Sequence, residues 1–379
     1  MRILLISDVS SHMRGGVPAE TRSLIRGLTQ RGHVVALASD APLGGAEEAL
    51  HVPMRLPVGD KVADDIGPAL ESFDPEFVHV ICMSSKGVVS LAPLLASRSW
   101  ALTVHSVPPY ERKLPRLHTS DALHYTVRAL RFLANSLAWR WVLRGAMVPR
   151  VIVHSQFVEE IVARYGGQKA RCSLIPLPFD CDEDASSVAS SLRNESAPLL
   201  VTVAGIAHTK GQRDVLKALP ELIAAFPGLR YQIVGEIRDE SYLQSLRDLA
   251  SSLGITKSVL ITPNLSGEDK RAALVSADVY VQPSHEEGFC LAFAEAAALV
   301  PRLVGTDTGA IAAMSRDDAG ARVVPTRQPR AIAAAVADLL RVGLSAGHMA
   351  ERAQRLSARF SLAGYVRSHE ELYAANSGR

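Results

Sequence analysis

The chain has 379 residues, more than one hydrophobic core usually covers, so we expect two domains of ordinary size. Its 47% of hydrophobic and 21% of charged residues are typical of a soluble globular protein, and no run of about 18 apolar residues could span a bilayer. Lys and Arg exceed Asp and Glu only as 41 to 39, which gives no general attraction for nucleic acid. The N-terminal apolar run is too short for a secretory signal, and the four cysteines show no metal-ligand spacing, so a reduced, cytoplasmic chain is expected.

The first half of the chain alternates short apolar runs with longer helical patterns. These runs are rich in Val, Ile and Leu and lie at residues 3–7, 34–39, 77–82, 101–106 and 151–155. Continuous apolar strands separated by helices indicate βαβ units and a parallel sheet covered on both faces.

A polar segment at 180–198 then interrupts the alternation, as expected for a linker. The apolar runs resume at residues 199–205, 231–236, 258–263, 279–284, 302–306 and 322–325. The sequence therefore predicts an α/β protein with two doubly wound domains in tandem. Their strand ends are expected to face one another across a cleft, since open α/β sheets bind ligands beyond the carboxyl ends of the strands.

Two glycine-containing turns each follow the first strand of one half and precede a helical pattern. In the first turn, Gly15 and Gly16 let a backbone approach a ligand and leave amides at a helix start, where an anion is favoured. An ordinary strand-to-helix turn explains two glycines equally well. The second turn runs from Gly205 to Gly211, and its Lys210 is placed to neutralise a phosphate beside a helix start. A solvated surface lysine is the alternative there.

The stretch HEEGFCLAFAEA (285–296) contains two glutamates, Glu287 and Glu295, eight residues apart. A glycosidase acid pair is one candidate, but its carboxyl groups lie about 5 to 9.5 Å apart, whereas eight residues along a helix rise about 12 Å. The spacing suits the two ends of one elongated polar ligand, with each carboxylate holding a sugar diol and the backbone amides between them facing a phosphate. The alternative is that Glu287 only complements the helix dipole and that Glu295 is solvated.

These residues match a known family. The segment PSHEEGFCLAFAEAAALVPRLVGTDTGA (283–310) resembles the donor-binding E-x7-E segment of the retaining glycosyltransferases of family 4, which have the GT-B fold of two facing Rossmann-like domains with an interdomain cleft. The resemblance covers nearly the whole chain through the motifs GGV, TVHS, VIVHS, IPLPFD, the KG loop, VGE and ADVYVQPS. It implies an acceptor-binding domain at 1–183, onto which a C-terminal helix at 362–379 packs, and a nucleotide-sugar-binding domain at 196–361.

The resemblance also implies a role for each matching residue. It assigns Glu287 to the donor-sugar hydroxyls, Glu295 to the nucleotide ribose and Lys210 to the diphosphate. His105 would lie beside the donor sugar, so that His105, Glu287 and Lys210 form the reaction centre. The rest of the donor site is expected at Gly15, Gly16, Gly205, Glu236, Leu265, Gly288, Phe289, Cys290 and Leu291. The acceptor pocket is expected just after His105, at Pro108, Pro109 and Tyr110.

Enzymes of this family break the anomeric bond while the nucleotide diphosphate leaves, usually without a bound metal, so we expect no cofactor beyond the nucleotide-sugar substrate. Lys210 and backbone amides must then meet the charge on the leaving phosphate. A UDP-sugar is slightly favoured as donor, with a hydroxyl group as acceptor. Two departures bear on the donor: Ile206 stands where the family commonly has an arginine, and Cys290 replaces the last glycine of an EGFG motif. His208 or Arg213 could supply the missing charge.

The segment 111–150 is rich in arginine, with Glu111 and Asp121 as its acidic residues, and is helical in pattern from residue 122 to 143. A basic amphipathic helix with Trp139 and Trp141 could rest on an anionic membrane and reach a lipid-linked acceptor. The alternative is a solvated arginine-rich face. The expected location is therefore cytoplasmic, with peripheral membrane contact as a hypothesis.

The sequence thus predicts a retaining glycosyltransferase of the hexosyltransferase type, which moves a sugar from a nucleotide-diphosphate sugar to a hydroxyl acceptor on a glycan, glycolipid or secondary metabolite. One alternative is a sugar-nucleotide epimerase of the same fold, which would need a further pair of acid/base carboxylates near the strand ends. Another is a non-catalytic sugar-nucleotide binder, since a fold does not determine a function.

Overall fold

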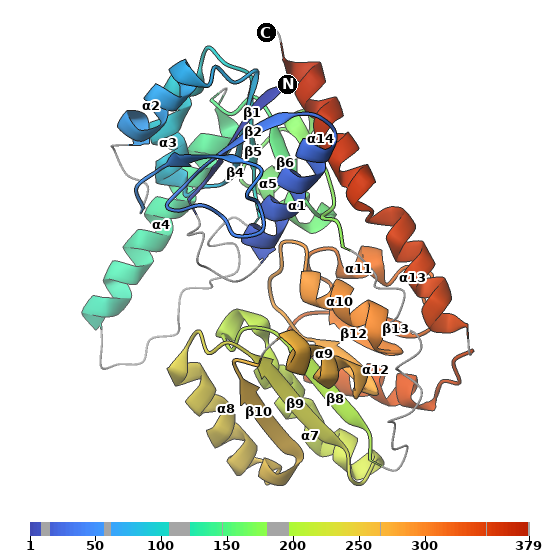
Figure 1. Cartoon of the computed structure of the whole chain (residues 1–379). Helices are drawn as coiled ribbons and strands as arrows, with labels where there is room; N and C mark the ends of the chain where they lie inside the picture. The colour runs from blue at the N-terminus through green and yellow to red at the C-terminus, as the bar shows by residue number, and fades with distance from the viewer. Residues whose placement is uncertain are drawn as a thin grey trace. The chain divides into compact units, whose positions relative to one another are not determined.

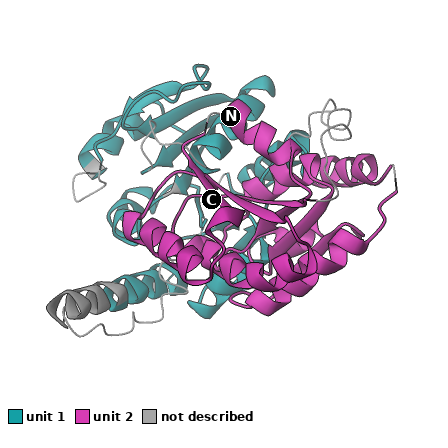
Figure 2. Cartoon of the chain, turned by 90° about the horizontal axis from the view of Figure 1, so that it is seen from below, with its two compact units in different colours: residues 1–178, 360–379 teal, residues 179–359 magenta. Residues whose placement is uncertain are grey.

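The chain divides into two compact units (Figure 2), of which unit 1 comprises Met1–Pro178 with Phe360–Arg379, and unit 2 comprises Phe179–Arg359. The structure is a computed structural model that describes residues 1–8, 16–56, 62–105, 122–145, 147–179, 197–265, 267–345 and 347–377. Most of the predicted linker lies outside the described residues. Each unit contains a parallel sheet with helices packed around it (Figure 1).

Unit 1 is built on a seven-stranded sheet in the order β3-β2-β1-β4-β5-β6-β7. Its strands are β1 (Arg2–Ser7), β2 (Val34–Ser39), β3 (Leu50–Pro53), β4 (Phe77–Cys82), β5 (Trp100–Thr103), β6 (Val151–Val153) and β7 (Cys172–Leu174). All neighbours are parallel, and β1 lies beside β2 with Leu4 opposite Ala36. Every residue of β1 after Arg2 is buried, as expected for a strand covered on both faces.

The helices of unit 1 include the last helix of the chain. They are α1 (Gly16–Gln30), α2 (Val62–Ser72), α3 (Ser85–Leu95), α4 (Ala122–Arg144), α5 (Gln156–Arg164) and α14 (Leu362–Asn376). Helix α14 packs against α1, and Gly27 lies at this contact, because a Cβ there would come within 2.2 Å of Val366 Cγ2. The absence of a side chain at Gly27 therefore allows the chain terminus to dock closely on unit 1.

Unit 2 is built on a six-stranded parallel sheet in the order β10-β9-β8-β11-β12-β13. Its strands are β8 (Leu199–Val203), β9 (Arg230–Gly235), β10 (Val259–Pro263), β11 (Val279–Gln282), β12 (Arg302–Thr306) and β13 (Ala321–Val324). Its helices are α7 (Gln212–Ala225), α8 (Glu240–Ser252), α9 (Gly267–Val275), α10 (Leu291–Leu299), α11 (Ile311–Met314), α12 (Pro329–Arg341) and α13 (His348–Arg359). Helix α7 packs beside α8 and α12, whereas α10 packs beside α9 and α13.

Each sheet has a point at which the strand order reverses. It lies between β1 and β4 in unit 1 and between β8 and β11 in unit 2. Open α/β sheets bind ligands outside the carboxyl ends of their strands at such a switch point. In unit 2, the loops that follow β8 and β11 are therefore the place to look for a site.

Candidate functional site

Lys210 and Glu287 come together at the switch point of unit 2. Lys210 ends a short 3-10 helix, His208–Lys210, after β8, and Glu287 lies in the loop between β11 and α10. Lys210 Nζ lies 2.8 Å from Glu287 Oε1. The same oxygen accepts from Ser284 Oγ at 2.6 Å and from Gln282 Nε2 at 3.2 Å. Three donors thus orient one carboxylate.

Lys210 remains charged in this environment. Burial by itself would lower the pKa of Lys210, but the charge and hydrogen bond of Glu287 outweigh it, so that the pKa is raised above its usual value. The lysine side chain is 24% exposed and the glutamate side chain 10% exposed. An anionic ligand that replaced Glu287 beside Lys210 would therefore find a cation already held in position.

Backbone contacts fix the loop that carries Lys210. Gly211, the next residue, has a φ of +68°, and a Cβ there would lie 2.0 Å from the carbonyl oxygen of Pro283. His285 binds both this loop and the helix after it, because its backbone N–H donates to Thr209 O at 2.8 Å and its Nε2 lies 2.7 Å from Oδ2 of Asp214 on α7. The two strand-end loops consequently hold each other in place.

Glu295 lies on the exposed side of α10. Its carboxylate forms an ion pair with Lys270 at 2.5 Å, and its side chain is 45% exposed. Lys270, on α9, was not singled out from the sequence. A ligand that uses Glu295 must replace Lys270, which is a modest cost for an exposed pair.

The segment that precedes α10 has an unusual backbone conformation. Cys290 has a φ of +83°, in the left-handed region that favours glycine, and α10 begins at Leu291. Burial raises the pKa of the Cys290 thiol well above its usual value, so the group stays neutral. On the neighbouring loop Gly309 has a φ of +57°, and a Cβ there would lie 2.8 Å from Phe289 O. The loop after β12 thus supports the segment that carries Glu287.

Arg238 is a candidate that sequence reasoning missed. A Cβ on Gly205 would meet Arg238 Cδ and Nε at 3.0 Å, so the arginine lies across this glycine, and its charge acts on Lys210. Ile206 is fully buried and bridges to Ile237. Arg238 follows β9 in the sequence, and only the pairing of β8 with β9 brings it beside the lysine loop. A basic residue just after a neighbouring strand is the signal that could have found it.

The remaining predicted residues of unit 2 lie near these loops. Glu236 follows β9, and its Oε2 lies 3.6 Å from Arg238 Nε. Leu265 follows β10 and is half-buried. The ring of His208 stacks on Tyr242 at 5.4 Å between centroids. The sequence suggested His208 or Arg213 as the charge beside Lys210, and the structure adds Arg238, whose charge acts on this lysine.

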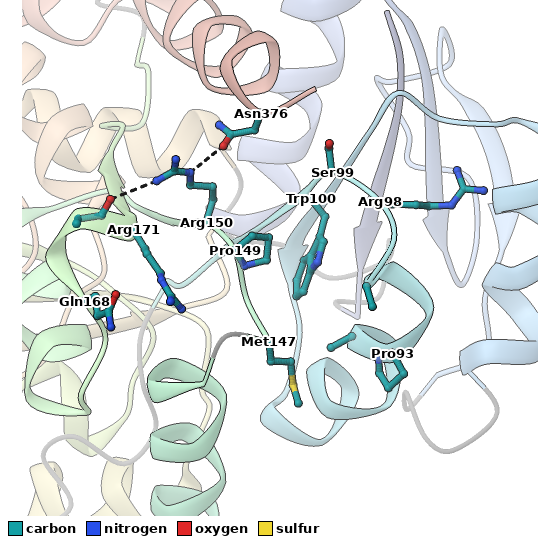
Figure 3. A pocket seen from close by; sticks show the side chains of 13 residues that line it. Pro93, Arg98, Ser99, Trp100, Met147, Pro149, Arg150, Gln168, Arg171 and Asn376 are labelled. Atoms are coloured by element: carbon teal, nitrogen blue, oxygen red, sulfur yellow. Dashed lines mark hydrogen bonds between the residues drawn. The ribbon is translucent and has the colours of Figure 1, made fainter. Parts of the chain in front are cut away.

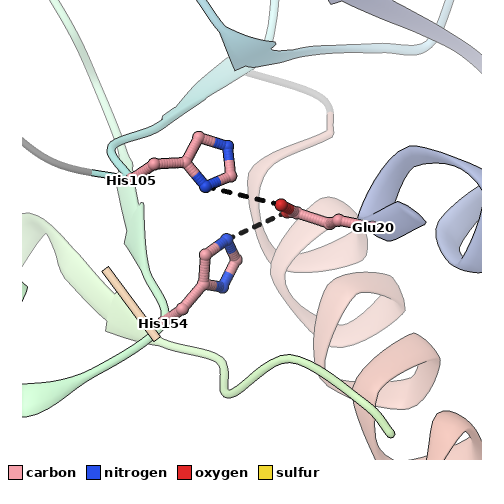
Figure 4. Close-up of side chains that lie close together, drawn as sticks. All are labelled: Glu20, His105 and His154. Carbon is pink, nitrogen blue, oxygen red and sulfur yellow. Dashed lines mark ion pairs between the residues drawn. The ribbon is translucent and has the colours of Figure 1, made fainter. Parts of the chain in front are cut away.

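In unit 1, several predicted residues lie outside the described part of the chain, namely Gly15, Pro108, Pro109 and Tyr110. Gly16 is the first residue of α1. His105 follows β5 and lies near His154, which follows β6, and near Glu20 of α1 (Figure 4). Glu20 and His154 were not predicted. For Glu20, the feature that could have indicated it is an acidic residue among apolar residues on one face of the helix. For His154, it is the histidine at the end of the VIVHS strand.

The ligating atoms of Glu20, His105 and His154 lie within 4.8 Å of one another, as a metal site would require. The chemistry favours a proton instead. A proton on His154 balances the single carboxylate, whereas a divalent cation would leave net positive charge where the Glu20 side chain is 0% exposed, and uncompensated buried charge is costly. We therefore do not identify these residues as metal ligands.

Helix α4 carries an exposed apolar stripe. Leu133, Leu137 and Trp141 are 54%, 57% and 55% exposed and follow one another at four-residue spacing, which puts them on one helix face. Trp139 is only 5% exposed and packs in the core of unit 1, so the expectation that both tryptophans face outward is wrong for Trp139. In the described part of the chain, the helices are too short or too polar to cross a membrane.

A cavity of about 810 Å³ lies at the other end of the unit 1 strands, where β5 and β6 begin (Figure 3). Arg98, Arg150 and Arg171 are among the residues that line it. Arg150 donates to Asn376 Oδ1 at 2.8 Å and to Ala170 O at 3.2 Å. Since β5 and β6 run away from this cavity, it is separate from the predicted site residues at their carboxyl ends.

Comparison with known families gives a match for each unit. Residues 15–178 match the model described as "Glycosyl transferase 4-like domain", and residues 184–356 match "Glycosyl transferases group 1". The chain is also similar to a GDP-mannose-dependent alpha-(1-6)-phosphatidylinositol monomannoside mannosyltransferase of Mycolicibacterium smegmatis, at 32% identity over 200 residues, 49% of this chain and 51% of that protein. It spans about half the length of the first such relatives. The glycogen synthase of Mycobacterium tuberculosis is 26% identical over 99% of this chain and 95% of its own length.

Solved structures resemble the chain over its full length. A sucrose-phosphate synthase of Thermosynechococcus elongatus has a TM-score of 0.77 at 17% identity, covering 99% of this chain and 98% of its own. HepE of Anabaena, in complex with UDP and glucose, has a TM-score of 0.70 at 16% identity, covering 98% of this chain and 99% of its own. At these identities the likeness shows the fold, which is the predicted arrangement of two Rossmann-like sheets.

Proposed function

Because the chain belongs to the glycosyltransferases of family 4, whose two domain models match its two units, we propose that it is a retaining enzyme that transfers a sugar from a nucleotide diphosphate to a hydroxyl group. The ion pair of Lys210 and Glu287 at the switch point of unit 2 carries the proposal. Lys210 offers a charge to a diphosphate, and Glu287 offers a carboxylate that can accept two sugar hydroxyls.

The difficult step is the departure of the nucleotide diphosphate, because negative charge builds up on its terminal phosphate as the anomeric bond breaks. Lys210 and Arg238 meet that charge, so we expect no resident metal ion. Glu287 turns from Lys210 to the sugar hydroxyls, while Glu295 releases Lys270 and accepts from the ribose. In the same proposal, His105 contacts the donor sugar.

The donor we propose is a UDP-sugar, with GDP-mannose as the competing candidate. The mannosyltransferase of Mycolicibacterium smegmatis is GDP-mannose-dependent by its name, and HepE was solved with UDP and glucose. Glu295 recognises a ribose, which both nucleotides contain, so the base must be distinguished elsewhere. The acceptor we propose is an alcohol on a glycan, glycolipid or secondary metabolite.

We also propose that α4 touches an anionic membrane surface. Its exposed stripe of Leu133, Leu137 and Trp141 provides apolar contacts, and the surrounding segment is rich in arginine. Sedimentation with phosphatidylglycerol vesicles should carry down the protein, and replacement of the three stripe residues by serine should abolish this. Equal binding to neutral phosphatidylcholine vesicles would contradict the electrostatic part of the proposal.

The test of the proposed transferase is a screen of UDP-, GDP-, ADP- and dTDP-sugars for release of the nucleotide diphosphate, alone and with candidate acceptors. Lys210→Ala should slow release about 10²- to 10³-fold, whereas Lys217→Ala on the exposed face of α7 should not slow it. An isomerised nucleotide sugar among the products would indicate an epimerase. Tight binding without turnover, over a full range of acceptors, would indicate a binder.

A further inference from the structure

Glu20 is a buried carboxylate that faces two histidine rings (Figure 4). His154 Nε2 lies 2.9 Å from Glu20 Oε1, and His105 Nδ1 lies 3.5 Å from Glu20 Oε2. The hydroxyl of Tyr365, on α14, donates to Oε1 at 3.3 Å. Oε2 accepts no hydrogen bond from the described residues.

Backbone carbonyls determine which nitrogen of each ring carries a hydrogen. His154 Nδ1 lies 2.7 Å from Ile175 O, and His105 Nε2 lies 3.0 Å from Ile81 O. A carbonyl oxygen can only accept, so both of these nitrogens must be protonated. In a neutral ring the other nitrogen is then bare. Both neutral rings would consequently point a lone pair at the Glu20 carboxylate.

Three acceptors that face one another repel unless a proton lies among them. The weak Tyr365 contact is not enough to satisfy a fully buried carboxylate. Burial favours a neutral Glu20, yet the charge of His154, the largest opposing cause, lowers the pKa of Glu20 to about 2. Burial also opposes the charged form of His154, but Glu20 raises the pKa of His154 above its usual value. Burial lowers the pKa of His105 despite Glu20, so the shared proton belongs to His154.

The other titratable groups that face this pair remain neutral. His79, on β4, lies between Tyr373 and Thr103 at 2.7 Å from each hydroxyl oxygen, and burial lowers its pKa well below the usual value. Burial lowers the pKa of His369, on α14, to about 4. Burial raises the pKa of Tyr365 and Tyr373 well above their usual values. Among the described residues that face it, the charged pair is therefore Glu20 with His154.

We propose that Glu20 and protonated His154 are positioning residues for His105, which they hold as the neutral tautomer anchored on Ile81 at the ends of β4, β5 and β6. The inference rests on the proposed function, in which His105 contacts the donor sugar. Both ring nitrogens of His105 face groups within unit 1. The ring therefore acts as a fixed wall of the donor site rather than as a group that exchanges a proton with the substrate.

This arrangement makes the site sensitive to alkaline pH. When His154 loses the proton on Nε2 to solvent, its lone pair faces the Glu20 carboxylate and the two groups repel. Without that cation nothing offsets the charge of Glu20, which then repels the bare Nδ1 of His105 and displaces the ring from the Ile81 carbonyl. Transfer should decline on the alkaline side at the pH where His154 titrates, whatever the acceptor.

The test compares Glu20→Gln with the wild type by NMR of labelled histidine rings, and by kcat and donor KM from pH 5.5 to 9.5. An amide carries no charge, so the midpoint of His154 should fall by at least about one pH unit, which is a tenfold change in proton affinity. The alkaline limb of kcat should disappear, because an amide has no charge to repel the bare Nε2 of neutral His154 and can donate an N–H to it.

A second variant tests the same point if Glu20→Gln folds poorly. His154→Gln can present an N–H to Glu20 at every pH, so its kcat should lack the alkaline limb that the wild type shows. The matched control is Glu370→Gln, which removes the partner of His33 from a similar pair at 2.8 Å in unit 1. It should leave both the midpoint of His154 and the alkaline limb of kcat unchanged.

An unchanged midpoint of His154 in Glu20→Gln, or an alkaline limb that persists in His154→Gln, would overturn the inference. Stoichiometric zinc in the purified protein that disappears in Glu20→Gln would overturn it in favour of a metal site. Absence of transfer from every nucleotide sugar would refute the proposed function instead. The histidine titrations would still decide whether Glu20 and His154 share the proton.

Discussion

Lys210 and Glu287 form an ion pair at 2.8 Å although 77 positions separate them in the sequence. They meet because β8 and β11 are neighbours in the sheet, and each residue follows the carboxyl end of one of these strands. The pair keeps a cation and a carboxylate ready where a ligand would enter. In the proposed reaction, the diphosphate replaces the carboxylate beside the lysine, and the carboxylate turns to the sugar.

Lys210→Ala should reduce kcat about 10²- to 10³-fold, the usual cost of removing one electrostatic stabiliser of a transition state. The folded protein should tolerate the change, because Glu287 keeps its hydrogen bonds from Ser284 and Gln282. Initial rates of nucleotide diphosphate release, together with the melting temperature, would check both points. A variant that melts as the wild type does and keeps full activity would refute the role of Lys210.

Arg238→Ala should reduce kcat/KM for the donor about tenfold, since a second charge that faces the leaving diphosphate is lost. Arg247→Ala on the exposed side of α8 removes an equal charge away from Lys210 and serves as the control. Affinity for the free nucleotide diphosphate, measured by calorimetry, should fall in the first variant alone. Equal losses in both variants would mean that only the overall charge of unit 2 matters.

Much of the fold was predictable because the central strands are continuously apolar. The C-terminal helix expected from residue 362 begins at Leu362, the first residue of α14, and ends at Asn376. The short edge strands β3 and β7 were missed, since they contain exposed or half-buried residues and lack a continuous apolar run. Trp139 could not be distinguished from Trp141 by sequence, because burial of a helix face depends on its neighbours.

The site was predictable where one loop carries its residues and not where several elements meet. Glu287 and Lys210 each stand in a motif, so the sequence indicated both. Arg238 and Glu20 were missed because their partners follow other strands, and only the strand order brings them together. Pairing between non-consecutive elements is what a single sequence does not contain.

Cys290→Gly should leave stability unchanged or raise it by up to about 1 kcal/mol. A left-handed conformation costs a residue with a side chain about 1–2 kcal/mol, while the freedom of glycine in the unfolded chain costs about 0.5–1 kcal/mol. Cys290→Val should destabilise, because branching at Cβ makes the same conformation worse. Chemical unfolding of the three proteins would show this order, and a less stable glycine variant would mean that packing of the thiol outweighs the backbone.

Stability should depend on pH through Glu20 and His154. The folded-state pKa of Glu20 is lowered to about 2, so its contribution is present above the unfolded pKa and is lost as the pH falls toward about 2. The folded-state pKa of His154 is raised, so its contribution to stability is complete below its unfolded-state pKa. That contribution is lost as the pH rises through the folded-state pKa. Glu20→Gln should cost on the order of 3 kcal/mol near pH 6 and less near pH 9. Calorimetric melting across this range measures the difference, and a constant difference would refute the coupling.

Gly211→Ala should destabilise the protein by about 2–3 kcal/mol, more than its backbone angle alone explains. Gly254 is a matched control, because its φ of +69° is nearly that of Gly211 at +68°, yet a Cβ on Gly254 would meet nothing within 4 Å. Alanine at Gly254 therefore measures the cost of the left-handed conformation. At Gly211 the added Cβ also lies 2.0 Å from Pro283 O, which is backbone and cannot rotate away.

The excess cost at Gly211 over Gly254 measures how firmly the loops after β8 and β11 are held together. Donor affinity should fall with that cost, since Lys210 is the residue before Gly211. Equal stability losses in the two alanine variants would show that the loops separate freely, and the proposed preorganisation of Lys210 would then fail.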